Sequence, residues 1–409
     1  MHRSRHASWP TVPVHELGKI VTGTTPPTMV KEYYGGDVPF VSPADIDGQR
    51  WISPGASSLT EKGASQARIL PPKSVLVSSI GILGKVGQSK QSVVTNQQIN
   101  AIVPGSIVDA HFLFHAAHLL ARQMKVVAGL QVVPIVNKRE FSKLGLPLPS
   151  LTEQRSIADI LDTLDDTIRK TEEIIAKLQQ AKQGLLHDLL TRGIDENGEL
   201  RDPERHPEQF KETVLGRVPS DWSVKRLTEI AEILDHLRIP INAEERERRT
   251  GNVPYYGANG QQGWIDRPLF CEPLVLLAED GGSFDEYATR PIAYRIDGPS
   301  WVNNHAHVLK AQSGVNRSFF FFSLEHRDIR RYISGGTRTK LTQSELRSIE
   351  VAVPNLPEQN LLAAIMEEHE SVIQHEKRAL LTVRLLKQGL MDDLLTGKVR
   401  VPEAEEALA

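Results

Sequence analysis

The chain has 409 residues and a formal net charge of −3, with 40% of its residues hydrophobic and 24% charged. This composition is typical of a globular protein of two to four domains. The single cysteine, Cys271, excludes a disulfide bond within the chain, so we expect a cytoplasmic location. No apolar run has the length of a membrane span, and the polar residues 1–10 do not resemble a signal peptide, so we expect no membrane contact.

Residues 1–148 predict a first globular domain, or head, built on short strands. The β-branched runs that indicate strands lie at residues 38–41, 74–78 and 99–103. The alanine-rich residues 111–127 predict a helix. Residues 80–87 are rich in glycine, but the GxxxxGK[ST] spacing of a phosphate loop is absent from the sequence, so a tight turn between strands is expected there.

Residues 149–193 predict one long helix. Its apolar residues recur at alternating steps of four and three, which is the heptad pattern of a left-handed coiled coil. The apolar seam includes Leu161, Leu164, Ile168, Ile175 and Leu178. Gly193 follows the last turn, where glycine commonly ends a helix. At about 1.5 Å per residue, about 38 residues give a rod of roughly 57 Å.

The helical segment occurs twice in the chain. Residues 148–193 align without a gap to residues 353–398, and both copies carry Glu-Gln near the start and Lys-Gln-Gly-Leu near the end. The seam of the second copy includes Met366, Ile373, Leu380 and Val383. So regular a register indicates a tandem duplication in which each half is a head followed by a long helix.

Polar residues interrupt both seams at equivalent positions. Thr171 in the first helix aligns with Glu376 in the second, and Lys182 aligns with Lys387. One explanation is partial exposure, with the long stems lying along the seam while their charged ends reach solvent. The other is that these residues fix the register of an antiparallel helix pair. Both explanations stay open at the level of sequence.

Between and after the helices the sequence predicts three further segments. Residues 194–222 are rich in proline and acidic residues and predict a linker, residues 223–352 predict a second head, and residues 399–409 form an acidic tail. The second head repeats the first loosely. The echoes pair Val224 with Val14, Val253 with Val38, Asn303 with Asn96 and Ser318 with His111. A constant frame with divergent heads indicates one scaffold carrying two different recognition surfaces.

Charge is divided unevenly along the chain. Residues 1–150 hold 15 Lys and Arg against 8 Asp and Glu, giving +7, and residues 223–355 hold 17 of each. The helical parts are acidic, with −6 in residues 151–222 and −4 in residues 356–409. This division suits heads that meet a polyanion and helices that do not.

The doubled head-and-helix layout resembles the specificity subunit of type I restriction–modification systems. The likeness covers almost the whole chain and is most specific in the LPxLxEQ lead into the first helix and the KQGLLHDLLT run at its end. It implies an α+β fold with a pseudo-two-fold internal repeat. In that fold two mixed α/β target-recognition domains are separated by two long antiparallel coiled-coil helices.

The resemblance also implies a division of labour. Each head would read one half of a split site in double-stranded DNA, and the repeats would dock two methyltransferase subunits that methylate adenine at N6. Two motor-endonuclease subunits would complete the restriction complex. S-adenosylmethionine, ATP and Mg²⁺ are expected in these partners. We expect no cofactor and no catalytic residue in this chain, whose sequence also lacks the [NDS]PP[FY] methyltransferase motif.

Chain connectivity favours antiparallel helices, because the second head starts near the end of the first helix. Heads held roughly 50–60 Å apart would address DNA segments more than one helical turn apart, about 34 Å. Helix length would then set the gap of a bipartite, asymmetric site. In this arrangement Leu164 and Ile168 are expected to lie opposite residues 373–383.

Base readout requires Arg, Lys, Asn, Gln, Ser or Thr on loops that face a groove. The glycine-rich residues 334–340 are the first candidate for DNA contact, and residues 129–139 are their counterpart in the first head. A solvated turn is the alternative for both. The candidate side chains are Thr337, Arg338, Thr339, Lys340, Gln131, Lys138, Arg139, Lys85, Lys90, Arg290 and Arg295.

Catalytic and metal-binding alternatives have weaker support. His305 and His307 are two residues apart, but no cysteine pair or HExxH motif accompanies them, so no metal is expected. The acidic residues 279–286 lie in one head only and lack the lysine motif of a nuclease. The remaining rival is a coiled-coil adaptor whose heads bind protein or glycan. The positive first head and the family resemblance count against it.

Overall fold

The structure is a computed structural model that describes residues 9–52, 57–129, 132–334 and 339–401. It divides into two compact units, one formed by residues 1–172 with 378–409 and the other by residues 173–377. Helices α6 (Leu151–Thr191) and α11 (Leu356–Leu394) each have one part in each unit. Among the described helices, none has the length and apolar character needed to cross a membrane.

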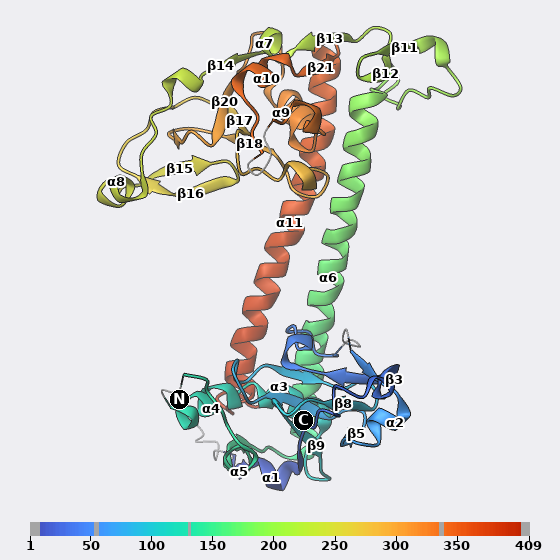
Figure 1. The fold of residues 1–409 in the computed structure, drawn as a ribbon, viewed down its shortest axis with the longest axis vertical. Coiled ribbons are helices and arrows are strands. Elements are labelled where there is room, and N and C mark those ends of the chain that lie inside the picture. Colours follow the sequence, from blue (N-terminus) through green and yellow to red (C-terminus); the bar gives the residue numbers. More distant parts are fainter. Residues whose placement is uncertain (1–8, 53–56, 130–131, 335–338, 402–409) are drawn as a thin grey trace, which may run out of the picture. The chain divides into compact units, whose positions relative to one another are not determined.

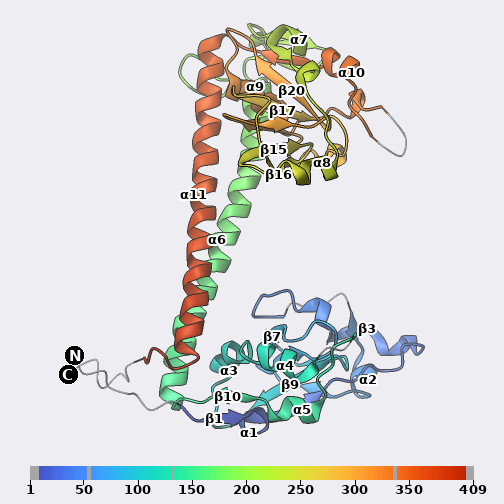
Figure 2. The same ribbon diagram turned by 90° about the vertical axis from the view of Figure 1, so that its left-hand side faces the viewer.

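The first head belongs to unit 1 (Figure 2). In chain order its elements are β1 (Thr11–Pro13), α1 (Val14–Leu17), β2 (Gly18–Thr22), η1 (Lys31–Tyr33), β3 (Tyr34–Val41), η2 (Pro43–Asp45), β4 (Ser58–Leu59), α2 (Glu61–Ala64), β5 (Ile69–Leu70), β6 (Val75–Ser78), β7 (Val86–Gln88), β8 (Val93–Thr95), β9 (Ile99–Pro104), α3 (Ala110–Ala117), α4 (Leu120–Ala128), α5 (Lys138–Lys143) and β10 (Gly145–Pro147). One sheet has the order β2-β9-β6-β7, a second has β4-β3-β8-β5, and β1 pairs with β10.

The predicted helix at residues 111–127 is divided in two. Helix α3 ends at Ala117 and α4 begins at Leu120. Between them the backbone N–H groups of His118 and Leu119 donate to carbonyls three residues back, which is the tighter 3₁₀ pattern. Alanine-rich sequence favours helix throughout this stretch, so local propensity gave no indication of the division.

The second head belongs to unit 2 (Figure 1). Its elements are β13 (Ser223–Arg226), α7 (Leu227–Ile230), β14 (Ala231–Ile233), η4 (Asp235–Leu237), α8 (Ala243–Arg248), β15 (Val253–Gly257), β16 (Gly260–Ile265), β17 (Leu274–Ala278), η5 (Phe284–Glu286), β18 (Ala293–Ile296), β19 (Trp301–Val302), β20 (Ala306–Ala311), α9 (Arg317–Glu325), η6 (Arg330–Tyr332), α10 (Gln343–Ser348) and β21 (Glu350–Val353). The larger sheet has the order β14-β20-β17-β18, and β13 pairs with β21.

The two heads share one topology. The order β14-β20-β17-β18 repeats β2-β9-β6-β7 strand for strand. Asn303 and Asn96 are equivalent, because each backbone N–H donates to the last paired residue of the neighbouring parallel strand, Tyr256 or Val41. The internal repeat predicted from the helices therefore extends through both heads.

One predicted echo is out of register by three residues. The backbone N–H of Val14 donates to Leu144 O, and the group that makes the equivalent bond to Ile349 O is Leu227 rather than Val224. Val224 instead lies in β13, whose counterpart is β1. A shared Val-x-x-Leu spacing at 14–17 and 224–227 caused the misalignment.

The segment predicted as a linker, residues 194–222, carries ordered structure. It contains η3 (Pro207–Gln209) and a hairpin of β11 (Phe210–Thr213) with β12 (Gly216–Pro219). Trp222 at its end is 1% exposed and belongs to the apolar core of unit 2. Its polar composition predicted a linker, whereas the buried Trp222 fixes the end of the segment to the core.

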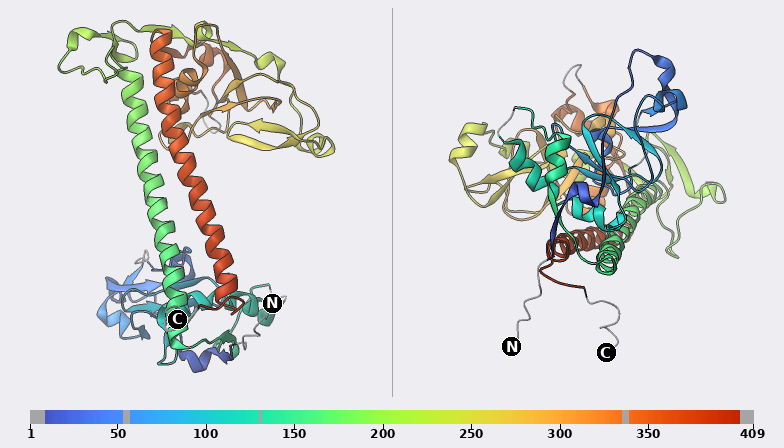
Figure 3. Two further views of the ribbon diagram at one scale, coloured as in Figure 1. Left: turned by 180° about the vertical axis from the view of Figure 1, so that it is seen from behind. Right: turned by 90° about the horizontal axis from the view of Figure 1, so that it is seen from below.

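In each unit the parts of α6 and α11 pack side by side in opposite directions (Figure 3). In unit 1, Asp165 contacts Lys387 and Glu172 contacts Arg384, so that numbers rise along one helix as they fall along the other. In unit 2, Leu186 and Leu189 share a core cluster with Leu362 and Met366. The antiparallel helix pair predicted from sequence is therefore present in both units.

Candidate functional site

The predicted seam residues occupy the inward faces of the two helices. Leu161, Ile175, Met366 and Ile373 are buried, while Leu164, Ile168, Leu178, Leu380 and Val383 are half-buried. Burial along the seam therefore does not simply decline away from the helix ends, since Ile175 and Ile373 near the middle of the helices are buried. Each buried apolar residue of the seam contributes to the packing of the helix pair.

A buried cation lies within the seam of unit 2. Lys182 is 9% exposed, and its Nζ lies 2.8 Å from Glu325 Oε1 of the head and 2.7 Å from Glu370 Oε1 of α11. Arg295 of β18 pairs with Glu370 at 2.8 Å. Lys182 is therefore paired on two sides rather than reaching for solvent, and it links α6 to α11 and to the second head.

Unit 1 repeats this polar layer with its helices exchanged. Lys387 of α11 pairs with Asp165 of α6, the position equivalent to Glu370. Its side chain is 19% exposed and that of Asp165 is 24% exposed. The explanation that the seam lysines fix an antiparallel register is thus the one that the contacts favour.

The register differs from the one expected for Leu164 and Ile168. Leu164 packs, with Leu390 and Met391, against the apolar cluster that includes Leu394 and Leu395, and Ile168 lines a cavity with Arg384 and Lys387. These partners lie beyond the expected range 373–383. The expected partners were estimated by pairing the middle of one helix with the middle of the other. That estimate was wrong because the Lys–carboxylate pairs set the register of the two helices.

The Glu of the repeated Glu-Gln pair forms the same clamp in both units. Glu153 accepts from Trp9 Nε1 at 3.2 Å and forms a two-point ion pair with Arg400, with Nε to Oε1 at 2.6 Å. Glu153 belongs to α6, whereas Arg400 follows the end of α11. The start of one helix is thereby fastened to the chain that leaves the other.

In unit 2 the equivalent Glu358 accepts from Trp222 Nε1 at 3.1 Å and pairs with Arg201 at 2.6 Å. Gly193, with φ +63°, packs into this clamp, where a Cβ would lie 2.4 Å from Arg201 and 2.7 Å from the Trp222 ring. The glycine is required both by its backbone angle and by space.

The Gln of the same pair joins each helix to its own head. Gln154 Oε1 accepts from the backbone N–H of Asp109 at 2.7 Å, and Gln359 Oε1 accepts from that of Asn316 at 2.9 Å. Asp109 and Asn316 are the N-cap residues of α3 and α9. One amide therefore fixes the first turn of a head helix to the start of each long helix.

A charged junction fastens the first head to α6. Asp162 accepts from Arg50, His111 and His115, with its Oδ2 2.8 Å from His111 Nδ1 and its Oδ1 2.7 Å from His115 Nε2. Burial opposes ionisation of Asp162, but the hydrogen bonds from His115, Arg50 and His111 outweigh it and lower its pKa. Burial also lowers the pKa of His115. The second head uses Arg295 and Ser318 on the equivalent Glu367.

The predicted DNA contacts fall into three groups. Thr337, Arg338 and Gln131 lie outside the described residues. Thr339, Lys340, Lys138, Arg139 and Lys90 are described and at least half-exposed, with Lys340 Nζ 2.9 Å from Glu279 and Lys138 and Arg139 in the first turn of α5. The third group binds the protein itself. Lys85 donates to Pro43 O, Arg290 pairs with Glu286, and Arg295 pairs with Glu367 and Glu370.

The structure brings two of the candidate segments to corresponding places in the two heads. The backbone N–H of Val136 donates to Ser79 O at 2.9 Å, and that of Leu341 donates to Glu279 O at 2.8 Å. Val136, in the first candidate segment, and Leu341, directly after the second, are therefore hydrogen-bonded to the residues that follow equivalent strands, β6 and β17. The contacts of these segments with DNA stay a prediction.

Three potential metal-ligand atoms, one each from Asp235, Glu279 and His307, lie within 4.8 Å of one another. These atoms already have partners. Arg238 lies 2.6 Å from Glu279 and 3.4 Å from Asp235, and both ring nitrogens of His307 are hydrogen-bonded. With a guanidinium between its carboxylates, the cluster is an ion-pair network within the second head.

Comparison with known proteins identifies the family. The family described as "Type I restriction modification DNA specificity domain" matches residues 7–180 and 219–383. The chain belongs to this family. The specificity subunit thus carries two copies of the domain, and each matched range holds one head with part of the long helix that follows it.

Curated relatives match either almost the whole chain or part of it. The MjaIX specificity subunit of Methanocaldococcus jannaschii is 23% identical over 97% of this chain and 94% of its own length. A putative specificity subunit of Haemophilus influenzae, S.HindORF215P, is 32% identical over 39% of each chain. The specificity subunit described here is a DNA-recognition protein of the type I restriction–modification class, and the adaptor alternative is not favoured.

Two solved structures share the fold. The S subunit from M. genitalium superposes with a TM-score of 0.60 at 16% identity, covering 97% of this chain and 98% of the other. A chain described under "Structural basis underlying complex assembly and conformational transition of the type I R-M system" superposes with a TM-score of 0.57 at 16% identity, covering 96% and 99%.

Sequence reasoning about the specificity subunit missed the clamp and junction residues. The sequence showed the Glu-Gln pair only as a feature that both copies share. Its repetition was the signal that the two pairs, Glu153 with Gln154 and Glu358 with Gln359, make equivalent contacts. Trp9, Trp222, Arg201 and Arg400 lie outside the gapless repeat, because the segments after the two helices differ in length. Only the three-dimensional contacts pair them.

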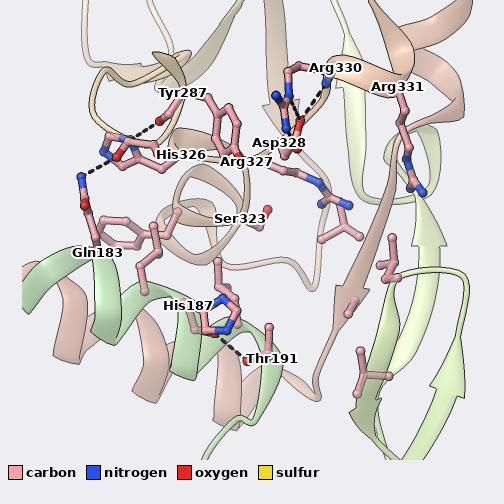
Figure 4. A pocket seen from close by; sticks show the side chains of 18 of the residues that line it. Gln183, His187, Thr191, Tyr287, Ser323, His326, Arg327, Asp328, Arg330 and Arg331 are labelled. Atoms are coloured by element: carbon pink, nitrogen blue, oxygen red, sulfur yellow. Dashed lines mark hydrogen bonds and ion pairs between the residues drawn. The ribbon is translucent and has the colours of Figure 1, made fainter. Parts of the chain in front are cut away.

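Unit 2 also contains a pocket of 860 Å³ beside the end of α6 (Figure 4). Gln183, His187 and Thr191 of α6 form one wall, and the α9 end with the following loop forms another. Arg327 lies on that loop, and Arg330 and Arg331 lie in η6. Leu186, Leu190, Val214, Val218 and Phe322 supply apolar surface.

Proposed function

We propose that this specificity subunit reads a bipartite, asymmetric site in double-stranded DNA, one half through each head. The observation that carries the proposal is the contrast between repeated and divergent parts. The helices repeat their Glu-Gln clamp and Lys–carboxylate layer, whereas the heads keep topology but differ in sequence. Recognition of an asymmetric split site requires two different recognition domains, and here they are attached to equivalent helices.

The helices, in this proposal, also dock two methyltransferase subunits, and two motor-endonuclease subunits complete the complex. Large apolar side chains that stay exposed among the described residues support a protein-binding role for α11. Leu381 is 59% exposed, Leu385 60% and Leu386 52%. S-adenosylmethionine, ATP and Mg²⁺ belong to the partners, which methylate adenine at N6, and the assembly works on DNA in the cytoplasm.

We expect the isolated chain to bind DNA without modifying it. Binding should weaken about tenfold or more between 50 and 200 mM salt, because phosphate contacts by Lys and Arg release counterions. Gel shifts across this salt range measure the effect, and incubation with S-adenosylmethionine, ATP and Mg²⁺ tests for chemistry. Methylation or cleavage that disappears on mutation of a residue of this chain would overturn the non-catalytic assignment.

Exchange of the first head should change one half of the methylated site only. Residues 12–148 are replaced by the head of a related subunit, because β1 pairs with β10 and so closes the head at its two connections. The chimera is expressed with its modification partner, and methylated adenines are mapped genome-wide. We expect one new half-site, with the other half and the gap unchanged.

The graft must preserve the junction with α6. Arg50, His111 and His115 all bind Asp162, so a head that lacks them leaves a half-buried carboxylate without its donors. The matched control grafts the same head with these three residues retained. A chimera of this second kind that alters both half-sites would show that the heads do not read independently.

A further inference from the structure

The first head has an apolar surface where two short segments lie side by side. Ile80, two residues after the end of β6, forms an antiparallel bridge with Ile135. On either side of this bridge the backbone N–H groups of Gly81 and Val136 donate from one segment to the other, at 3.0 and 2.9 Å. Opposite residues of such a pair have their side chains close together on one face. The two isoleucines therefore share one face of this pairing.

Further apolar side chains next to this bridge are exposed. Ile82 is 66% exposed, Val133 52% and Ile135 itself 43%. The hydrogen bond from Gly81 to Pro134 O joins the chain neighbours of Ile82 and Val133. Single exposed apolar residues are ordinary on protein surfaces, whereas several on two hydrogen-bonded segments indicate a binding surface. Ile82, Val133 and Ile135 are called the apolar patch below.

The loop that presents Ile82 is fixed by hydrogen bonds and by packing. Ser78 O accepts from the backbone N–H of Gly84 at 2.9 Å. The Ser78 hydroxyl accepts from the backbone N–H of Lys85 at 2.9 Å and donates to Ile82 O. Gly84, with φ +78°, packs on Ala121, where a Cβ would lie 2.4 Å from the alanine Cβ. A loop that is already ordered loses little conformational entropy on binding, so Ile82 is held ready for contact.

Cationic side chains lie close to the patch. Lys138 and Arg139 begin α5, three and four residues after Ile135, and both are exposed. Arg122, also exposed, follows the alanine on which Gly84 packs. Lys and Arg bind DNA phosphates, and the apolar group that a base presents in the major groove is the 5-methyl group of thymine. In a DNA-recognition protein, an apolar surface with cations beside it fits a major groove that contains thymine.

The second head has charged residues at the equivalent place. Strands β6 and β17 occupy the same position in their sheets, and each is followed by one antiparallel bridge to a later segment. In the second head this bridge joins Asp280 to Lys340. Asp280 pairs with His305, and Lys340 Nζ lies 2.9 Å from Glu279. One position in the fold therefore presents apolar residues in the first head and acidic and basic residues in the second.

We propose that the apolar patch of the first head contacts the 5-methyl groups of thymines in the major groove, and that the first half-site is recognised in part through these methyl groups. This inference rests on the proposed function. A methyl group that Ile82, Val133 or Ile135 removes from water contributes to binding through the hydrophobic effect. Because the methyl group marks one strand of the base pair, the contact distinguishes T·A from A·T as well as from G·C.

The test uses the chain assembled with its modification partner and duplexes that carry the mapped site. Deoxyuridine replaces the thymines of the first half-site one at a time, which removes the 5-methyl group and keeps the base pairing. We expect Kd to rise about fourfold at each contacted thymine, the effect of one methyl group returned to water.

The variant Ile82→Ala removes part of the patch from a side chain that is mostly exposed, so the head should keep its fold. In this variant deoxyuridine should have a smaller effect at the thymine that Ile82 contacts, because the two changes remove the same contact. Ile69→Ala is the matched control. It shortens an isoleucine of β5 in the same head that is 54% exposed, and it should leave both Kd and the effect of deoxyuridine unchanged.

Three results would overturn the proposal. One is a mapped first half-site that contains no thymine or at which deoxyuridine never changes Kd. Another is an effect of deoxyuridine that is the same at every thymine in the wild type and in Ile82→Ala. The third is weaker binding of the modification partner to Ile82→Ala in the absence of DNA, which would assign the patch to a protein interface.

Replacement of the whole first half-site tests the proposed function separately. If this replacement leaves Kd unchanged, the proposed function itself fails. If it weakens binding while deoxyuridine has no effect, the first head still recognises its half-site, and only the role of the apolar patch is wrong.

Discussion

Matched insertions of four residues, after Leu178 in α6 and after Ile373 in α11, should widen the gap of the DNA site by one or two base pairs. Each insertion adds about 6 Å and turns the helix by roughly 40°, because a turn holds about 3.6 residues. Both insertion points lie between the two polar layers, so Lys182 keeps Glu370 and Lys387 keeps Asp165. Mapping of methylated adenines measures the gap, with both half-sites expected unchanged.

The control carries the insertion in α6 alone. One helix then gains a turn relative to the other, and the two layers cannot both keep their pairs. We expect this variant to lose stability or partner binding rather than to read a new gap. A double insertion that folds, assembles and still recognises the original spacing would show that something other than helix length sets it.

Replacement of the seam cation, Lys182→Met, should destabilise unit 2 by about 3–5 kcal/mol, the loss typical of a buried ion pair broken on one side. Methionine matches the length of the lysine stem, so the main loss is electrostatic. Glu325, with a side chain 8% exposed, would keep its charge without the lysine. Hydrogen exchange over residues 173–377 measures the opening free energy of this unit separately.

Lys387→Met is the matched control in unit 1. The Lys387 and Asp165 side chains are more exposed than Lys182 and Glu325, so solvent can compensate the carboxylate and a smaller loss is expected. Adding Glu325→Met to Lys182→Met should recover part of the loss, since apolar pairs often replace buried ion pairs well. Equal losses at the two lysines would contradict this account of the layer.

The two long helices could be predicted because their sequence pattern is periodic. Heptad spacing and a gapless repeat predicted both helices and the seam that includes Leu161 and Met366, and chain connectivity predicted their antiparallel pairing. None of these signals determines the register of one helix against the other. The register depends on the ion pairs that Lys182 and Lys387 form with carboxylates far away in the sequence. For this reason Leu164 was assigned the wrong partners.

The heads were less accessible to sequence reasoning. Short β-branched runs located β3, β6 and β9, but the shared topology of the two heads rests on pairings between distant strands. Arg295 looked like a DNA contact from its neighbours in the chain, whereas in space it meets Glu367 and Glu370. The residue type alone does not distinguish a Lys or Arg that contacts DNA phosphate from one that forms an ion pair with a helix of the protein.

The paired clamps have a consequence for how such genes diversify. Glu153 and Glu358 make the same contacts, and each long helix joins its own head through an equivalent glutamine. A crossover within the coding sequence of either helix therefore brings in a foreign head with compatible attachments on both sides. Such an exchange would give a new target sequence in one step, without the intermediate loss of assembly that gradual redesign of a recognition surface would entail.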